Sequence, residues 1–335
     1  MSRSFRHLLI AGGAGFIGSN FVRLLRATHP DVQITVLDAL TYSGNRANLA
    51  DLDVELVHDS VTNRERVLSI AASADAIVNF AALTHVDRSV MDPLEFVRTN
   101  VEGTAVLCEA ARQCRHQVFL QVSTDEVYGH VPSGRSHEAD PLRPRSPYSA
   151  SKAGGEMIAW AHAETYGLPV LVTRGSNTYG QFQYPEKLVP VLITNAIDGM
   201  KLPLYKDGSA VRDFVQVEDH CRAIDLVLHE APAGGVYNIG TGVETSGKQV
   251  AEAVLDIMGR PRSMIEYVAD RPGHDYRYAL DIKRITDLGW EPRISLADGL
   301  DRTVSWYQDH EDWWRPLKSG EYWEFYQRNY KPLDV

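Results

Sequence analysis

Cysteine is scarce in this chain of 335 residues. Its three cysteines, Cys108, Cys114 and Cys221, include no C-x-x-C pair. An odd number of cysteines without that spacing argues against a disulfide framework and against a zinc site, so we expect no metal. Free thiols suit a reducing compartment, and the sequence therefore predicts a cytoplasmic location.

Long apolar runs and basic patches are missing as well. No apolar run approaches the roughly 20 residues that a membrane-spanning helix needs. The basic-then-apolar segment 3–17 is short and broken by glycines, so it is not expected to be a signal peptide. The net charge of −10 comes without a basic stripe that would bind a phosphate backbone. We therefore expect neither a membrane nor a nucleic acid as a partner.

The chain does contain a regular alternation of short apolar runs with longer amphipathic stretches. The apolar runs predict strands at residues 7–11, 33–37, 54–58, 76–80, 118–122 and 170–174. This pattern is typical of an α/β fold with a doubly wound parallel sheet. We expect that domain in residues 1–175 and a smaller C-terminal α/β lobe, which binds substrate, in 176–335. A further strand at 236–240 predicts that segment 211–240 returns to the sheet. The aromatic residues of 306–330 are expected to pack against the body.

A glycine-rich segment, Gly12-Gly13-Ala14-Gly15-Phe16-Ile17-Gly18, follows the first predicted strand and opens a helix expected at 16–27. Glycines there let the backbone turn tightly and approach a pyrophosphate, which rests on the helix N-terminus. Asp38 ends the second strand, at the distance expected for a carboxylate that binds the adenosine ribose and repels a 2′-phosphate. The sequence thus predicts a Rossmann sheet that binds NAD rather than NADP, a preference that Arg46 nearby would weaken.

Other candidate cofactor contacts follow the carboxyl ends of later strands, where ligands of such sheets collect. Small side chains at Ala81 and Ala82 would let the cofactor pass close to the sheet edge, while Thr84 is placed to bind substrate. The predicted NAD contacts are Gly12, Gly15, Phe16, Ile17, Gly18, Asp38, Asp59, Ser60, Ala81, Ala82, Thr99, Tyr148 and Lys152.

Two carboxylates stand side by side in the segment Ser123-Thr124-Asp125-Glu126, directly after the fifth predicted strand. Like charges at this distance push their pKa values apart, leaving one carboxyl as an acid beside the other as a base. We therefore expect Asp125, in its protonated form, to give a proton and Glu126 to take one. An ordinary dehydrogenase needs no such pair.

Tyr148 and Lys152 are four residues apart after Pro147, which suits the first position of a helix. Residues at this spacing share a helix face, so the ammonium of Lys152 is predicted to lower the pKa of the Tyr148 phenol. Tyr148 would then act as a general base on a sugar hydroxyl, with a hydrogen bond through Thr124.

The order of these motifs closely resembles the dTDP-glucose 4,6-dehydratases of the extended short-chain dehydrogenase/reductase superfamily. The resemblance also rests on segments 85–89 (HVDRS), 185–188 (PEKL), 212–213 (RD) and 271–275 (RPGHD), and it covers nearly the whole chain. It implies bound NAD, a dTDP-hexose substrate and a homodimer. It further implies that the nucleotide-sugar site is lined by Asn177, Glu186, Lys187, Leu188, Arg212, Asn238, Arg271, His274 and Tyr278.

The implied activity is that of a lyase of the hydro-lyase type. The substrate would be oxidised at C4, lose water across C5 and C6, and receive the hydride back at C6, giving dTDP-4-keto-6-deoxyglucose. Two positions depart from the family: Gln181 stands where proline is usual, and Leu83 stands where a polar residue is common. Both lie near the expected sugar or cofactor path and bear on which hexose binds.

Three other functions share parts of this pattern. A nucleotide-sugar 4-epimerase has the same fold and Tyr/Lys pair but needs no acid/base pair after Thr124. A uronic-acid decarboxylase, such as one acting on UDP-glucuronate, needs a cation facing a C6 carboxylate. A non-catalytic NAD-binding protein would not need the catalytic set at all.

Overall fold

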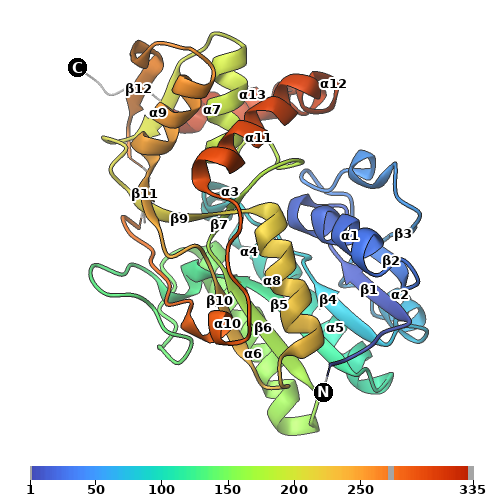
Figure 1. The fold of residues 1–335 in the computed structure, drawn as a ribbon. Helices are drawn as coiled ribbons and strands as arrows, with labels where there is room; N and C mark the ends of the chain where they lie inside the picture. Colours follow the sequence, from blue (N-terminus) through green and yellow to red (C-terminus); the bar gives the residue numbers. More distant parts are fainter. Residues whose placement is uncertain (1, 271–274, 331–335) are drawn as a thin grey trace.

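The computed structural model describes residues 2–270 and 275–330 of the chain. Its centre is a seven-stranded sheet in the order β10-β6-β5-β4-β1-β2-β3, in which every neighbouring pair is parallel (Figure 1). The predicted doubly wound α/β fold is confirmed. The strands of this sheet are β1 (His7–Ala11), β2 (Gln33–Asp38), β3 (Glu55–His58), β4 (Ala76–Asn79), β5 (Val118–Thr124), β6 (Val170–Gly175) and β10 (Val236–Ile239).

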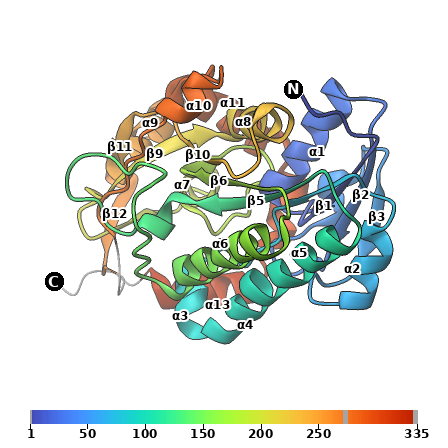
Figure 2. The same cartoon turned by 90° about the horizontal axis from the view of Figure 1, so that it is seen from below.

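Helices cover both faces of the sheet because its strands are apolar on both sides. Leu8 and Ile10 of β1 belong to the core formed with α1 (Phe16–Thr28) and α8 (Val217–Glu230). Leu9, between them, belongs to the opposite core. That second core is formed with α2 (Arg64–Ala71), α5 (Gly103–Gln113) and α6 (Pro147–Tyr166), which lie together on one side of the sheet in Figure 2.

The smaller lobe contains two short sheets and its own core. β11 (Glu244–Ser246), β9 (Val211–Gln216) and β7 (Asn177–Tyr179) form one sheet, while β12 (Ile265–Val268) pairs with β8 (Leu202–Tyr205). Its core is formed by α7 (Leu188–Ile197), α9 (Gly247–Ile257) and α11 (Leu296–Asp309).

The segment 211–240 is divided between the two parts. As predicted, β10 returns to the main sheet beside β6, and α8 packs on α1. Contrary to the prediction, β9 at the start of the segment pairs with β7 and β11 instead, because its Phe214 is buried in the core of the smaller lobe.

Short helices complete the chain: η1 (Arg46–Leu49), α3 (Val86–Met91), α4 (Pro93–Val97), η2 (Arg98–Glu102), η3 (Asp125–Tyr128), η4 (Arg262–Met264), α10 (Lys283–Asp287), α12 (Glu311–Trp314), η5 (Arg315–Leu317) and α13 (Gly320–Asn329). The aromatic tail packs as expected, since Tyr307, Trp314 and Tyr322 are buried. Within the described ranges, no helix has the length and apolar character to cross a membrane.

Candidate active site

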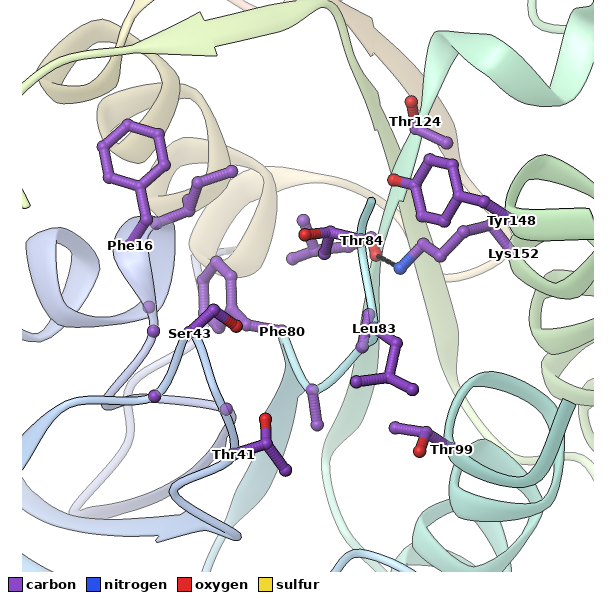
Figure 3. Close-up of a pocket in the computed structure, with 18 of the residues that line it drawn as sticks. Phe16, Thr41, Ser43, Phe80, Leu83, Thr84, Thr99, Thr124, Tyr148 and Lys152 are labelled. Carbon is purple, nitrogen blue, oxygen red and sulfur yellow. Dashed lines mark hydrogen bonds between the residues drawn. The ribbon is translucent and has the colours of Figure 1, made fainter. Parts of the chain in front are cut away.

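A cavity of about 410 Å³ opens over the carboxyl ends of β1, β2, β4, β5 and β6. The glycine segment and Asp38 line one end, and residues from the smaller lobe line the other. Figure 3 shows Phe16 on one side of this pocket and Tyr148, Lys152 and Thr124 on the other. The position is where parallel α/β sheets bind ligands.

Backbone atoms shape the cofactor end. Gly12 has φ +76°, and a Cβ atom added to it would lie 2.5 Å from the backbone nitrogen of Ala81. A Cβ atom on Gly18 would lie 2.3 Å from the carbonyl oxygen of Gly12. Gly15 caps α1 without a side-chain hydrogen bond, so the first amides of the helix face the pocket without competition from a capping side chain. The spacing of these glycines therefore leaves room for a pyrophosphate.

Asp38 is fixed at the far side of this end. Its carboxylate accepts hydrogen bonds from the amides of Ala14, at 2.9 Å, and Leu40, at 2.8 Å. Burial raises the pKa of Asp38, and these two amide hydrogen bonds act in the opposite direction. The side chain is held in the geometry that a ribose-binding carboxylate requires.

All but one of the predicted cofactor residues line the pocket. These are Gly12, Gly15, Phe16, Ile17, Gly18, Asp38, Ser60, Ala81, Ala82, Thr99, Tyr148 and Lys152. The exception is Asp59, whose carboxylate accepts hydrogen bonds from the Ser60 amide and the Asn63 side chain instead. The sequence prediction missed Thr41, Ser43, Gly44 and Thr62, which also line this end and carry no motif.

Tyr148 and Lys152 lie side by side in the pocket wall (Figure 3). Pro147 opens α6 as predicted, after Ser146, which forms a capping box with Ser149. Lys152 donates a hydrogen bond from Nζ to the carbonyl oxygen of Val122, at 2.7 Å. Both side chains are buried, which places the Tyr/Lys pair in a low-dielectric wall.

The structure contradicts the prediction that Lys152 lowers the pKa of Tyr148. Burial raises the pKa of Tyr148 well above its usual value, and the charge of Glu126 acts in the same direction, while a hydrogen bond with Thr124 opposes them. Burial lowers the pKa of Lys152 to about 8, against the charge of Glu156. The free energy of burying the phenolate or the ammonium therefore has a larger effect on these two pKa values than the interaction between the side chains of Tyr148 and Lys152.

The carboxylate pair is part of the buried wall and not a solvated turn. Asp125 is only 3% exposed, and it begins η3, where β5 ends. Thr124 caps η3 by accepting the Glu126 amide, at 3.3 Å, and donates its hydroxyl to Asp125, at 3.2 Å. Burial, together with the charge of Glu126, raises the pKa of Asp125 to about 8. This raised pKa favours the protonated form of Asp125 at neutral pH, which is the form that its predicted role as proton donor requires.

Four of the predicted substrate residues line the pocket: Thr84, Asn177, Glu186 and Lys187. Lys187 donates from Nζ to the carbonyl oxygen of Thr84, at 3.0 Å, and so joins the two lobes across the cavity. Within the described part of the chain, the side-chain oxygen of Asn177 and one carboxylate oxygen of Asp125 are buried without a hydrogen-bond partner. Such atoms are expected where a polar ligand supplies the partner.

Of the remaining predicted substrate residues that the structure describes, none lines this cavity. Leu188 packs against the core of the smaller lobe. Asn238 is fully buried, where its amide donates to the carbonyls of Ser136 and Asp281 and accepts from the Tyr128 hydroxyl. These hydrogen bonds turn it away from the pocket.

Arg212 and Tyr278 lie outside the lining but near the carboxylates. The guanidinium of Arg212 sits 4.4 Å from the Tyr278 ring centre, and its charge lowers the pKa of Asp125 against the larger effects of burial and Glu126. Arg271 and His274 fall outside the described residues.

Comparisons with known proteins agree with this geometry. Residues 9–303 match the family model described as GDP-mannose 4,6 dehydratase. The chain is 50% identical to a dTDP-glucose 4,6-dehydratase of Streptomyces niveus, over 94% of this chain and 96% of that protein. It is also 49% identical to the low-salt glycan biosynthesis protein Agl12 of Haloferax volcanii, over 90% of this chain and 98% of that protein.

The chain belongs to the dTDP-glucose 4,6-dehydratase family. Among solved structures, DesIV, a dTDP-glucose 4,6-dehydratase from Streptomyces venezuelae with NAD bound, superimposes with a TM-score of 0.91 at 48% identity, covering 93% of this chain and all of that one. A UDP-glucose 4-epimerase of Thermus thermophilus with NAD has a TM-score of 0.86 at 32% identity, covering 91% of this chain and 99% of that one. The dehydratases are thus the more similar in sequence, and NAD is the cofactor that the glycine end fits.

Two contacts at the pocket were not predicted from the sequence. Arg88 does not line the cavity itself but donates to Glu186, which does, at 3.1 Å, and lies 4.2 Å from the Tyr42 ring centre. Burial raises the pKa of Glu186. His220 of α8 also lines the cavity, where its Nδ1 contacts the Thr178 hydroxyl at 2.7 Å and burial lowers its pKa to about 4. No spacing in the sequence signals these contacts, because the partners lie 42 or more residues apart.

The sequence predicted no metal site. Of the described residues, His29, Asp225 and His229 have ligand-type atoms within 4.8 Å of one another, and none of them lines the pocket. The two imidazole rings are stacked, with only 16° between their planes. The lone pair of an imidazole nitrogen lies in the plane of its ring, so two stacked, nearly parallel rings do not direct their lone pairs to one point, which is a poor arrangement for a tetrahedral ion.

Proposed function

We propose that this chain converts dTDP-glucose into dTDP-4-keto-6-deoxyglucose as an NAD-dependent hydro-lyase. The observation that carries the proposal is the buried carboxyl group of Asp125, which has one oxygen without a hydrogen-bond partner and stands next to Glu126 in the pocket wall that holds Tyr148. The characterised function of the relatives, stated in the names of the Streptomyces proteins, supports the same reaction.

Each catalytic residue has a role that follows from its position. NAD held at the glycine end supplies the acceptor, and later the donor, of one hydride. Tyr148, in contact with Thr124 and beside Lys152, takes the proton of the C4 hydroxyl. Glu126 takes the C5 proton, which the neighbouring C4 ketone has made acidic. Asp125 gives its proton to the departing C6 hydroxyl, so that water leaves, and reprotonation at C5 completes the product.

We assign nucleotide-sugar recognition to Thr84, Asn177, Glu186 and Lys187, which line the end of the pocket opposite the glycine segment. Lys187 carries the positive charge that a diphosphate requires. The residues of this lining are supported from behind by Leu188, Arg212, Asn238 and Tyr278. Arg271 and His274 remain predicted contacts.

The carboxylate pair favours dehydration over the related reactions. A 4-epimerase only oxidises and reduces C4 and has no use for a protonated Asp125. A uronic-acid decarboxylase would bring a C6 carboxylate beside Glu126, where two negative charges repel each other. The acid at this position instead suits a C6 hydroxyl, which needs a proton in order to leave.

The proposal is tested by incubating the purified protein with a set of nucleotide sugars that includes dTDP-glucose, UDP-glucose, GDP-mannose and UDP-glucuronate. We expect loss of one water from dTDP-glucose without added oxidant, which mass spectrometry detects. Proton NMR of the same samples detects epimerisation, which leaves the mass unchanged. Turnover of UDP-glucose to UDP-galactose with dTDP-glucose unchanged would replace this proposal with the epimerase.

We also propose that the protein forms a homodimer through α3, α4 and α6. These helices contact one another and carry large side chains that are about half or more exposed: Val90 (53%), Met91 (50%), Leu94 (76%), Val97 (49%) and Met157 (50%). A cluster of this kind marks an interaction surface. Leu94→Glu should give a monomer in light scattering, whereas Val243→Glu, at another exposed position outside the cluster (60%), should leave a dimer.

A cytoplasmic location is part of the same proposal. All three thiols are free, and Cys108 and Cys221 are buried, where burial raises their pKa and keeps them unreactive. Fractionation of the cells that express the protein tests this location.

A further inference from the structure

The loop between β7 and α7, residues 180–187, forms much of the substrate end of the pocket. Gln183, Tyr184, Glu186 and Lys187 of this loop all line the cavity. None of the catalytic residues belongs to it, because Asp125 and Glu126 follow β5 and Tyr148 lies in α6. The position of the loop therefore determines where a nucleotide sugar lies relative to the catalytic wall, by which we mean Asp125, Glu126 and Tyr148.

Gln181 joins this loop to the cofactor-binding helix α1. Its side-chain amide donates to the Asn20 side-chain oxygen at 2.9 Å, and the Asn20 amide donates to the Gln181 carbonyl at 3.1 Å. Asn20 is almost fully buried, two residues after the glycine segment that forms the other end of the pocket. The two ends are thus connected by a reciprocal pair of hydrogen bonds.

Phe182, the next residue, has a backbone conformation that requires external support. Its φ is +65°, in the left-handed region that is unfavourable for a bulky side chain. Its ring lies 4.6 Å from the guanidinium of Arg23 in α1 and contacts Trp306 and Trp313, with ring centres at 4.9 and 5.8 Å. Such a conformation persists only where surrounding contacts hold it.

The contacts around Phe182 come from both parts of the molecule. Trp306 belongs to α11 of the smaller lobe, whereas Arg23 belongs to α1 of the main domain. Trp313 donates its indole N–H to Asn48 of η1 at 2.9 Å, and Tyr307 donates its hydroxyl to the Gln183 carbonyl. The loop is therefore held between the two parts at the residues that precede its pocket-lining segment.

We propose that Gln181 and Phe182 are positioning residues that fix the substrate end of the pocket against the cofactor helix. Neither residue lines the cavity, so they act through Gln183, Glu186 and Lys187. The hydrogen bond from Gln181 to Asn20 needs a side-chain amide, which proline, the residue that the family resemblance implies at this position, does not have. The inference rests on the proposed function only in its choice of dTDP-glucose as the substrate.

Steady-state kinetics of Gln181→Ala and Phe182→Ala, in protein that retains NAD, test the proposal. We expect KM for dTDP-glucose to rise about tenfold for Phe182→Ala and about threefold for Gln181→Ala, with kcat within about twofold of the unsubstituted protein, because only the binding loop moves. The matched control is Tyr166→Ala, which removes a ring 5.1 Å from the Arg112 guanidinium at the remote end of α6. Its KM should not change.

Two further variants separate positioning from stability. Phe182→Gly removes the ring, but glycine adopts a positive φ without strain. This variant should therefore raise KM as much as Phe182→Ala does, while unfolding at a higher temperature than Phe182→Ala. Phe182→Tyr keeps the ring and should restore KM. A KM that stays unchanged in both Phe182→Gly and Phe182→Ala would overturn the proposal.

Hydrogen exchange of the backbone amides, measured without substrate, tests the positioning role of Gln181 and Phe182 whatever the substrate is. Amides of residues 180–187 should exchange faster in Phe182→Ala and Gln181→Ala than in the unsubstituted protein, and unchanged exchange contradicts the proposal. Failure of the unsubstituted protein to turn over dTDP-glucose would instead refute the proposed function and leave this exchange result valid.

Discussion

The two ends of the pocket are built in different ways. The cofactor end is shaped by the backbone of a short glycine segment, in which a Cβ atom on Gly12 or Gly18 would collide with other backbone atoms. The substrate end depends on side chains that reach across the chain, such as Lys187, which donates to the carbonyl oxygen of Thr84, 103 residues away. A substitution at the cofactor end therefore disturbs the backbone that receives NAD. A substitution at the substrate end removes a single contact and weakens substrate binding by that contact alone.

The largest expected effect is at the cofactor end. Gly12→Ala places a methyl group 2.5 Å from Ala81 and a side chain at φ +76°. The left-handed backbone alone costs about 1–2 kcal/mol, and the collision adds to this cost, so we expect NAD affinity to fall at least about 100-fold. NAD released from the purified protein by denaturation measures the effect.

The matched control is Gly234→Ala, at φ +83° with no other atom within 4 Å of the added Cβ. It carries the same backbone strain without the collision and should retain NAD. Equal loss of NAD from both variants would show that general destabilisation, and not the shape of the cofactor end, explains the result.

The next effect is at the catalytic wall between the two ends. Asp125→Asn removes the proton donor but leaves Tyr148 and the C4 oxidation unchanged. Water elimination should slow by about 10²–10⁴-fold, and reduced cofactor absorbing near ~340 nm should accumulate on the enzyme. Stopped-flow absorbance and product mass follow the two steps separately. Elimination at the unsubstituted rate would remove the carboxylate pair from the mechanism.

The pH dependence of the same wall gives a third test. Asp125 acts as an acid only while protonated, and its pKa is about 8, so single-turnover elimination should decline as pH rises above that value.

The raised pKa also predicts that Asp125 contributes most to folding stability at low pH and that this contribution is lost as pH rises toward about 8.

Chemical denaturation across this pH range should therefore show a smaller loss of stability in Asp125→Asn than in the unsubstituted protein. Lys152→Met provides the kinetic control: C4 oxidation should slow, while the alkaline decline of elimination persists. An elimination rate that increases above pH 8 contradicts the assignment of Asp125.

The smallest effect is expected at the substrate end. Lys187→Met removes one charged donor, which spans the cavity to Thr84, and should raise KM for dTDP-glucose roughly tenfold while NAD content is unchanged. Lys201→Met, which removes an exposed donor to the Ser263 carbonyl, is the control and should not alter KM. A loss of NAD from Lys187→Met would show that the two ends are not separable.

The sequence by itself determined what depends on neighbouring residues. The apolar run 7–11 predicted the first strand, and the glycine segment predicted the pyrophosphate turn and α1, because close backbone approach there admits only glycine. Pro147 and the Tyr/Lys spacing predicted the start of α6, and Asp125 next to Glu126 predicted an acid beside a base.

Only the tertiary structure decided what depends on burial and on distant partners. Burial of Tyr148 outweighed the predicted effect of Lys152 on its pKa, and long-range hydrogen bonds turned Asn238 away from the pocket. Pairing with β7 placed β9 in the smaller lobe, and contacts from α1 and α11 fixed Phe182 in its strained conformation. Local motifs specify backbone geometry, but the free energy of a buried charge or a packed loop depends on every element around it, and the linear order of residues does not reveal those neighbours.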